Sequence, residues 1–406
     1  MADIQKFLWG AAISAHQSEG NNVNSDIWLA ENVTPTIFRE RSGDACDSYH
    51  LYGQDIAIGA DIGLNAYRFG IEWSRIEPEQ GHFASAELDH YARVLDTCHE
   101  SGIAPMVTLS HWSMPQWFSA LGGFETDESV DHFARFTEKV AERLGPLMAA
   151  ATTFNEVNIL RVMRNSPGFK GMGGSRMAGM MEACAKACGS ERFSTVLFSP
   201  LENIESNMIK AHRRAYDIMK AGPGDYPVGI TLALSAVQGV GEHNLADQVA
   251  ADIYGPWLGT MSHADFVGVQ CYTRLLVGPD GPIPPAANAE RTTMGYEFYP
   301  EAIGITLRDA AARTGKPVYV TENGIATDDD TRRVAYIDIA TREVLKARAD
   351  GIDVRGYFHW SLLDNFEWFL GYGPRFGLVE VDRETFHRRP KPSAYHLGAI
   401  AKADLG

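Results

Sequence analysis

The chain has 406 residues, of which 45% are hydrophobic and 22% charged, a composition typical of a globular protein with a substantial core. Its 36 basic and 52 acidic residues give a formal net charge of −16, and no basic cluster interrupts this acidic balance, which argues against a nucleic-acid partner. No stretch reaches the ~20 apolar residues that a bilayer span requires, so we expect no membrane partner.

Eight short apolar runs with strand character recur along the chain, and stretches of helical periodicity lie between them. The predicted strands are 7–13, 66–71, 104–109, 151–154, 227–232, 266–269, 317–320 and 354–360, and the predicted helices include 86–101, 129–144, 204–220, 299–314 and 332–349. This alternation indicates parallel strands joined by right-handed crossovers. Eight repeats favour an α/β fold with a single (β/α)8 TIM barrel, one domain over residues 1–406, rather than an open doubly wound sheet. Its active site is expected at the carboxyl ends of the strands.

Two segments between these elements have the composition of loops. Residues 166–190, rich in Gly, Met and Ala, follow the fourth strand and are predicted to form a flap. Residues 278–285, rich in Gly and Pro, follow the sixth strand. They are predicted to be a loop that flanks the active site rather than a linker between domains.

Two glutamates, Glu156 and Glu322, each follow a short apolar, β-branched run. Such a run is typical of a buried strand, so both carboxylates are expected where a strand ends and a loop begins. Paired carboxylates across a cleft are what glycoside hydrolysis requires. Taken singly, a Glu after a strand is more often a surface or capping residue, so the interpretation depends on the other strand ends.

Polar and aromatic residues collect at nearly every predicted strand end. In chain order they are His16, Gln17 and Glu19; Arg68, Glu72 and Trp73; His111 and Trp112; Asn155 and Glu156; Gln270 and Tyr272; Glu322 and Asn323; and Trp360, Asp364, Asn365, Glu367 and Trp368. Aromatic rings cover the apolar faces of a sugar, and polar groups fix its hydroxyls. Each residue alone has a structural explanation, but their joint occurrence indicates a carbohydrate site.

The five cysteines are odd in number and scattered, which is not a disulfide framework for so long a chain. Cys184 and Cys188 stand one helical turn apart, but no nearby histidine completes a metal site, so structural thiols are expected. We expect neither a metal nor a cofactor. The sequence enters fold-like residues at Phe7 without signal-peptide character, so a cytoplasmic location is the default expectation.

The chain resembles the β-glucosidases and related enzymes of glycoside hydrolase family 1 over essentially all of its length. The motifs that carry the resemblance lie at 7–10, 17–20, 67–69, 73–76, 111–112, 155–156, 294–295, 321–324, 360–368 and 375–378. The Thr-Glu-Asn-Gly motif at 321–324 and the Trp-rich motif at 360–368 are the most specific. The resemblance implies a retaining exo-β-glycosidase acting on small-molecule β-glycosides.

The resemblance also implies roles for individual residues. Glu156 is the expected acid/base and Glu322 the expected nucleophile, with Arg68 and Tyr272 orienting the nucleophile. The expected substrate-binding residues are Asn155 for the 2-hydroxyl, Gln17, His111, Trp112, Glu367 and Trp368 for the rest of the glycone, and Trp360 as a platform beneath the ring. A retaining mechanism requires the two carboxyls ~5–5.5 Å apart, and the charge of Glu322 should raise the pKa of Glu156.

Several positions depart from the family pattern. They are Ser113 for a usual aspartate, Val157 for the proline after the acid/base, Gln270 for a common asparagine, Tyr296 for a tryptophan and Glu380 for a tyrosine. The stretch 159–174 is also compressed. These changes fall on or near the leaving-group side, so the sequence predicts the sugar better than the aglycone.

A carboxylate at Glu367 would repel a 6-phosphate, which favours unmodified glucose, galactose or fucose. Arg161 and Arg164 follow the acid/base and are either surface charges or contacts to a polar or anionic aglycone. Two other functions stay open: a transglycosidase that uses the same intermediate, and a carbohydrate-binding relative without catalysis. A metal-dependent hydrolase is disfavoured because no His-x-His or similar ligand cluster follows a strand.

Overall fold

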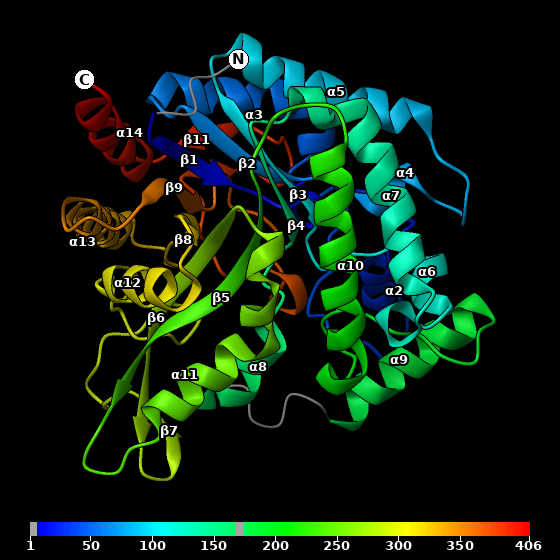
Figure 1. The fold of residues 1–406 in the computed structure, drawn as a ribbon. Coiled ribbons are helices and arrows are strands. Elements are labelled where there is room, and N and C mark those ends of the chain that lie inside the picture. Colours follow the sequence, from blue (N-terminus) through cyan, green and yellow to red (C-terminus); the bar gives the residue numbers. More distant parts are fainter. Residues whose placement is uncertain (1–5, 168–173) are drawn as a thin grey trace.

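Eight parallel strands close into a barrel that helices surround (Figure 1). The computed structural model describes residues 6–167 and 174–406. The barrel strands are β1 (Leu8–Ala12), β2 (Ala66–Gly70), β3 (Ala104–Ser110), β4 (Ala150–Phe154), β5 (Val228–Gly239), β6 (Phe266–Gly278), β8 (Val318–Asn323) and β9 (Val354–Trp360). Each pairs with the next in this order, and β9 pairs with β1 to close the ring. The predicted (β/α)8 TIM barrel is therefore confirmed. The organisation as one domain over residues 1–406 stays a prediction.

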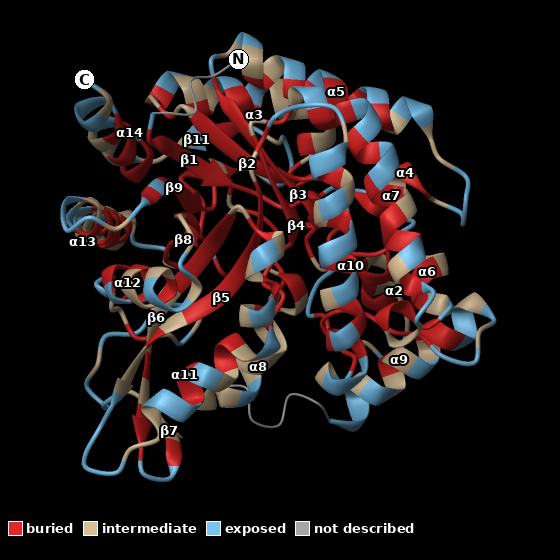
Figure 2. Ribbon diagram, viewed as in Figure 1, coloured by how far each residue is buried: buried red, intermediate tan, exposed pale blue. Residues whose placement is uncertain are grey.

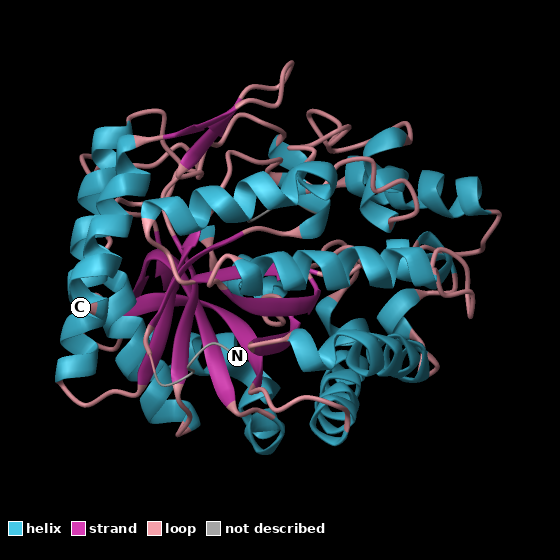
Figure 3. Cartoon of the chain, turned by 90° about the horizontal axis from the view of Figure 1, so that it is seen from above, coloured by secondary structure: helices cyan, strands magenta, loops and turns pink. Residues whose placement is uncertain are grey.

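Figure 3 shows the strands at the centre and the helices around them. The larger helices are α3 (Ser48–Ile62), α5 (Ser85–Glu100), α7 (Ser129–Leu144), α9 (Ser175–Cys188), α10 (Leu201–Ala221), α11 (Ala246–Tyr254), α12 (Ala302–Thr314), α13 (Asp330–Ala349) and α14 (Pro392–Leu405). The short ones are α1 (Ala15–Ser18), α2 (Asp26–Asn32), α4 (Trp73–Ile76), α6 (Gln116–Ala120) and α8 (Ile159–Asn165), with the 3-10 turns η1 (Gly123–Glu125), η2 (Gly145–Leu147), η4 (Gly255–His263) and η5 (Trp368–Leu370). None of the described helices combines the length and the apolar character needed to cross a membrane.

The core has two layers because successive side chains of a strand point to opposite faces. On β9, Phe358 and Trp360 belong to one hydrophobic cluster, whereas Tyr357, the residue directly before Phe358, belongs to another. The first cluster contains no helix residue and fills the barrel, where alanines such as Ala66 face large rings. The second packs the strands against the helices, so the strands are buried on both faces (Figure 2).

β5 and β6 run well beyond the predicted ends at 232 and 269. Past the barrel they pair with each other, from Ala236 opposite Arg274 to Gly239 opposite Val277. β6 then turns into the short antiparallel strand β7 (Gly281–Ile283). The prediction of a plain loop at 278–285 is wrong, because Gly278 and Gly281 pair across a hairpin turn.

The described part of the predicted flap at 166–190 is mainly the helix α9. Its residues Met180, Cys184 and Ala185 are buried in a cluster with Ile27 and Phe38, so the flap prediction is wrong for this helix. Residues 168–173 of that prediction lie outside the described residues. Cys184 is buried in this cluster and Cys188 packs against it, in agreement with structural thiols.

The remaining short elements complete the carboxyl-terminal region. Strands β10 (Val379–Val381) and β11 (Arg388–Pro390) form a separate antiparallel pair. β10 follows the loop that leads away from β9, and Leu363 of that loop bridges to Val379. This pairing fixes the segment that carries Glu367 and Trp368 over the barrel end.

Candidate active site

A cavity of about 910 Å³ opens at the carboxyl ends of the barrel strands. Its wall contains most of the predicted site residues: His111, Trp112, Glu156, Tyr272, Glu322, Trp360, Glu367 and Trp368. The other three lie directly behind the wall and are hydrogen-bonded to wall residues: Gln17 to Glu367, Arg68 to Glu322 and Asn155 to Gln270. The structure thus brings the whole predicted set together at the expected end of the barrel.

The carboxylate of Glu322, near the end of β8, accepts three hydrogen bonds. Arg68 Nη1 and Gln270 Nε2 donate to its Oε1 at 2.7 and 2.9 Å, and the Tyr272 hydroxyl donates to its Oε2 at 2.7 Å. Arg68 itself is fully buried on β2. Charge-assisted hydrogen bonds of this kind stabilise the ionised form of a carboxyl group.

Two of these donors, Arg68 and Gln270, also orient Asn155. Its Oδ1 accepts from Arg68 Nη2 at 2.6 Å and from Gln270 Nε2 at 2.7 Å. Its Nδ2 is buried and has no partner among the described residues. Because buried amides normally satisfy their hydrogen-bonding capacity, the Asn155 amide is placed to donate to a ligand.

Glu156 lies at the abrupt end of β4 and is buried. Its φ of 43° falls in the left-handed region that residues other than glycine rarely adopt, so its placement costs backbone strain. The surrounding structure holds it there. Glu156 N donates to Thr231 Oγ1 at 2.9 Å, and Asn158 Nδ2 donates to the backbone carbonyls of Ala233 and Ile253. Val157 N also donates to Thr231 O at 3.3 Å, a bond that the usual family proline lacks.

The surroundings of the two glutamates affect the pKa values of their carboxyl groups differently. Burial, and then the charge of Glu322, raise the pKa of Glu156 well above its ordinary value. Burial also raises the pKa of Glu322, but the charge of Arg68 and the hydrogen bonds from Tyr272 and Arg68 oppose this rise. The structure therefore favours a protonated Glu156 beside an ionised Glu322.

Aromatic rings form the other side of the cavity. The His111 ring stacks on Trp360 and Trp368 with centroids 5.6 and 6.1 Å apart, and Trp112 lies 5.0 Å from Trp368. Burial, and then the charge of Arg68, lower the pKa of His111 well below its ordinary value, so the ring is neutral. The His111 Nδ1 and Trp112 Nε1 atoms have no partner within the described structure, so both are positioned to bind a ligand.

Gln17 and Glu367 form a second polar pair in the cavity. Gln17 Nε2 donates to Phe366 O at 2.7 Å and to Glu367 Oε2 at 3.3 Å, while its Oε1 accepts from Ser14 Oγ at 2.8 Å. Burial and the charge of Glu322 raise the pKa of Glu367 to about 8. Several carboxyl groups thus share a cavity in which the guanidinium of Arg68 is already engaged.

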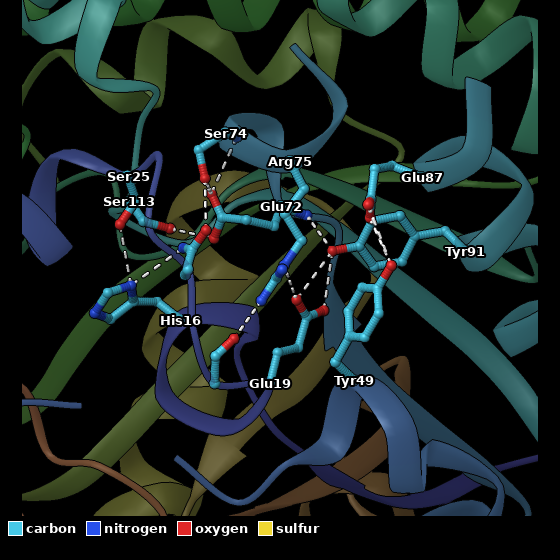
Figure 4. Close-up of polar contacts among 12 residues, drawn as sticks. His16, Glu19, Ser25, Tyr49, Glu72, Ser74, Arg75, Glu87, Tyr91 and Ser113 are labelled. Atoms are coloured by element: carbon cyan, nitrogen blue, oxygen red, sulfur yellow. Dashed lines mark hydrogen bonds and ion pairs between the residues drawn. The ribbon is translucent and has the colours of Figure 1, made fainter. Parts of the chain in front are cut away.

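Other strand-end residues belong to a separate buried network and not to the cavity wall (Figure 4). Glu19 accepts from Arg75 Nε at 2.7 Å and from the Tyr91 hydroxyl at 2.9 Å. Glu72 accepts from Ser113 Oγ at 2.7 Å, which explains the missing family aspartate, because a carboxylate at 113 would face Glu72. The expectation that Glu19 and Glu72 serve a sugar site is therefore wrong.

Further residues that shared this expectation also have structural roles. Trp73 is fully buried, and its Nε1 donates to Glu77 at 2.7 Å. Asp364 pairs with Lys391 Nζ at 2.7 Å. Asn323 donates to Tyr336 at 3.1 Å and accepts from the hydroxyl of Tyr357 at 3.0 Å. His16 contacts Asn22 and Ser25 through Nδ1. These contacts fix the loops that lead into the cavity.

Arg161 and Arg164 are engaged by acidic partners. Arg161 donates to both carboxylate oxygens of Glu205 at 2.6 Å and to Asp252 Oδ1 at 3.0 Å. Arg164 pairs with Asp252 as well. The interpretation of these residues as contacts to an anionic aglycone is not supported, because their charges are already matched within the protein.

The cavity also contains residues to which the sequence assigned no role. Gln270 was expected only as a polar residue at the end of the sixth strand and as a departure from the family pattern, yet its amide joins Asn155 to Glu322. Tyr296 and Met294 line the wall, and the hairpin of β6 and β7 adds Leu276 and Ile283. The predicted position of residues 278–285 beside the site is confirmed by Ile283, but the hairpin itself was not predicted, because it depends on the pairing of β6 with β7. Among the described residues, no three His, Cys, Asp or Glu side chains gather in a way that could hold a metal ion.

Comparison with known proteins agrees with this site. The sequence profile described as Glycosyl hydrolase family 1 matches residues 4–274 and 282–405. β-Glucosidase A of Thermotoga maritima is 32% identical over 98% of this chain and 97% of its own length. A 1,4-β-D-glucan glucohydrolase of Thermotoga neapolitana is also 32% identical, over 98% of this chain and 97% of its own. The apo structure of a β-glucosidase designated 1317 is 47% identical, covers 98% of this chain and 99% of its own, and superposes with a TM-score of 0.95.

Proposed function

Because the chain belongs to glycosyl hydrolase family 1 and is a β-glycosidase, we propose that it hydrolyses small, non-phosphorylated β-glycosides with retention of anomeric configuration. The observation that supports this most strongly is the difference in protonation between two carboxyl groups of the cavity. Glu322 is held ionised by three donors, and Glu156 in the same cavity has a raised pKa. One nucleophile and one proton donor are what the first step of retention requires.

In the first step, Glu322 Oε attacks the anomeric carbon while Glu156 transfers its proton to the departing oxygen. The bond from the anomeric carbon to the aglycone breaks, an alcohol leaves, and an ester links Glu322 to the sugar. Asn155 Nδ2 donates to the 2-hydroxyl, a contact that strengthens as positive charge develops on the sugar ring. Arg68 and Tyr272 keep the Glu322 carboxylate ionised and in place before attack.

In the second step, water replaces the aglycone. The ester no longer carries the negative charge of Glu322, which had raised the pKa of Glu156. The pKa of Glu156 therefore falls, and its carboxylate accepts a proton from the water as the water attacks the anomeric carbon. The Glu322 ester breaks, the β-sugar is released, and both glutamates return to their initial states.

We propose glucose as the preferred sugar. Gln17, His111, Glu367 and Trp368 offer hydrogen-bonding groups to the outer hydroxyls, and Trp360 offers an aromatic face to the ring. The names of the Thermotoga relatives, a β-glucosidase and a β-glucan glucohydrolase, support this choice. A 6-phosphate is disfavoured because the ionised Glu322 would repel it, and because Arg68, which could neutralise it, is engaged by Glu322 and Asn155.

Substrates that differ in leaving-group acidity test the assignment of Glu156. In Glu156→Ala, hydrolysis of an alkyl β-D-glucoside should fall by ~10²–10⁴-fold, whereas 2,4-dinitrophenyl β-D-glucoside, whose leaving group needs no proton, should form the glycosyl-enzyme at a nearly normal rate. Glu205→Ala, a change of another buried glutamate that lies outside the cavity wall, serves as the control. Equal losses for both substrates in Glu156→Ala would contradict the role of Glu156 as proton donor.

A further inference from the structure

We infer that the part of the cavity beyond Glu156 binds an apolar aglycone, an alkyl or aryl alcohol, in preference to a second sugar. This inference rests on the proposed function, since it concerns the group that leaves when Glu156 donates its proton. It goes further by assigning the chemical class of that group.

Apolar side chains from three separate segments build one wall of this part of the cavity. α8, which begins three residues after Glu156, contributes Met163. The extended part of β6 contributes Leu276, and β7 contributes Ile283. Leu276 and Ile283 are direct partners across the hairpin, so their side chains lie together on the same face. Leu276 and Ile283 therefore form one apolar patch, and Met163 adds a further apolar side chain to the lining of the same cavity.

The side chains of this wall are not used by the protein core. Met163, Leu276 and Ile283 are partly buried and pack against none of the three hydrophobic clusters found among the described residues. α8 contains no buried residue: Ile159, Leu160 and Val162 pack partly against the core clusters, whereas Met163 does not. Apolar side chains that stay partly exposed around a cavity indicate a surface that a ligand covers. Covering them removes apolar area from water, which favours binding.

The charged side chains at the same wall are already engaged within the protein. Arg274 donates to the two carboxylate oxygens of Glu297 at 2.8 and 2.6 Å. Arg164 is paired with Asp252, and Arg291 donates to two backbone carbonyls. A second sugar placed here would lose water from its hydroxyls without gaining these donors, which disfavours its binding.

The β6–β7 turn lies outside the residues that the family profile matches. The family profile matches up to residue 274 and resumes at residue 282, so Leu276 lies in the unmatched interval. Leu276, one of the three side chains of this wall, is thus a feature of this chain that the family profile does not supply, whereas Met163 and Ile283 lie in matched residues.

Binding of non-hydrolysable glucosides to the wild-type protein tests the inference. Titration calorimetry with methyl, butyl and octyl 1-thio-β-D-glucoside, each below its micelle concentration, should show a dissociation constant that falls with chain length, by up to ~4-fold for each fully buried methylene. A dissociation constant independent of chain length would overturn the inference. This result does not depend on turnover, so loss of the proposed function and loss of the apolar site are distinguishable. In parallel, octyl β-D-glucoside should be hydrolysed with a kcat/KM at least ~10-fold above that of cellobiose, and the reverse order would also overturn the inference.

A double variant locates the effect on the wall. Met163→Ser with Leu276→Ser should raise the dissociation constant of the octyl thioglucoside by ~10-fold or more and leave that of the methyl compound unchanged. Ile305→Ser is the matched control, because Ile305 is 40% exposed on α12 and lies outside the cavity wall. Equal losses for the methyl and octyl compounds, or no loss for either, would contradict the assigned wall.

Discussion

One of the three hydrogen bonds to Glu322 comes from Gln270, a strand-end residue to which the sequence assigned no role beyond a departure from the family pattern. Its Nε2 lies 2.7 Å from Asn155 Oδ1 and 2.9 Å from Glu322 Oε1. A single amide therefore positions both the group proposed to attack the sugar and the group proposed to hold the 2-hydroxyl. Arg68 and Gln270 both donate to Glu322 Oε1, and both stabilise the ionised form of Glu322. Loss of one of these donors therefore weakens the site without abolishing it.

Replacing Gln270 with alanine should lower kcat/KM for a nitrophenyl β-glucoside by ~10-fold, the equivalent of one lost hydrogen bond to a charged group. The Gln270 bond favours the ionised form of Glu322, so its removal raises the pKa of Glu322. The acidic limb of the pH profile of kcat/KM should therefore move to higher pH. Gln238→Ala, a change of a partly buried glutamine outside the cavity wall, should move neither quantity, and an unshifted acidic limb in Gln270→Ala would contradict the positioning role.

The charge of Glu322 also acts on Glu156. It is the second cause, after burial, of the raised pKa of Glu156. Replacement by the neutral amide in Glu322→Gln should therefore lower the pKa of Glu156. Carbon-13 NMR of labelled glutamates measures this pKa directly, with Glu156→Gln identifying the resonance. An unchanged or raised pKa in Glu322→Gln would show that the two carboxyls are not coupled.

Sequence reasoning at the residue scale succeeded where a motif fixed the chemistry and failed where only a strand end was visible. Glu156, Glu322, Arg68 and Tyr272 meet at the cavity because each lies on or directly after its own barrel strand. Glu72 also follows a strand, yet its carboxylate turns to Ser113 and away from the cavity. The direction of a side chain at a strand end depends on neighbours distant in sequence, which periodicity does not reveal.

At the scale of elements, the barrel could be predicted almost completely, whereas the hairpin beside the cavity could not. Each barrel strand is a short apolar run with its own local pattern, and β9 has the predicted bounds, Val354–Trp360. The outer parts of β5 and β6 are strands only because they pair with each other. Because the residues of these outer parts are partly exposed and some of them are polar, no continuous apolar run marks these parts as strands.

Packing of α7 on β4 supports the strand that ends at Glu156. The Phe133 ring of α7 is fully buried and stacks on Phe154 of β4, with centroids 4.5 Å apart and planes 18° from parallel. Phe133→Ala removes this contact and leaves a cavity, so we expect the free energy of unfolding to fall by about 3–5 kcal/mol in denaturant titration. The exposed Leu121, changed to alanine, should alter it by less than ~0.5 kcal/mol. A loss below ~1 kcal/mol in Phe133→Ala would show that α7 and β4 do not depend on this contact.

At the scale of the whole molecule, buried neutral histidines should make the fold sensitive to acid. Burial lowers the pKa of His212 from 6.5 to about 3. Between these pH values His212 is therefore neutral in the folded protein and protonated in the unfolded chain. Stability is therefore present above pH ~6.5 and is lost as the pH falls toward ~3. Between pH 7 and pH 5 this histidine alone should reduce the free energy of unfolding by about 2 kcal/mol.

Denaturant titrations of the wild type and His212→Gln at pH 7 and pH 5 measure this contribution. The difference between the two proteins should shift by about 2 kcal/mol in favour of the variant at the lower pH. A difference that does not change with pH would show that His212 titrates alike in the folded and unfolded states. The exposed His50, changed to glutamine, serves as the control, because it lies at the surface, where it pairs with Asp47.

The central claim is that Glu322 forms a covalent bond with the sugar. The protein is incubated with 2,4-dinitrophenyl 2-deoxy-2-fluoro-β-D-glucoside. The fluorine at carbon 2 slows both steps, and the good leaving group allows the glycosyl-enzyme intermediate to accumulate. Mass spectrometry of the intact protein followed by peptide mapping should show one fluoroglucosyl group, attached to Glu322. A label on any other residue, or no label together with release of the α-sugar from an ordinary β-glucoside, would contradict the mechanism.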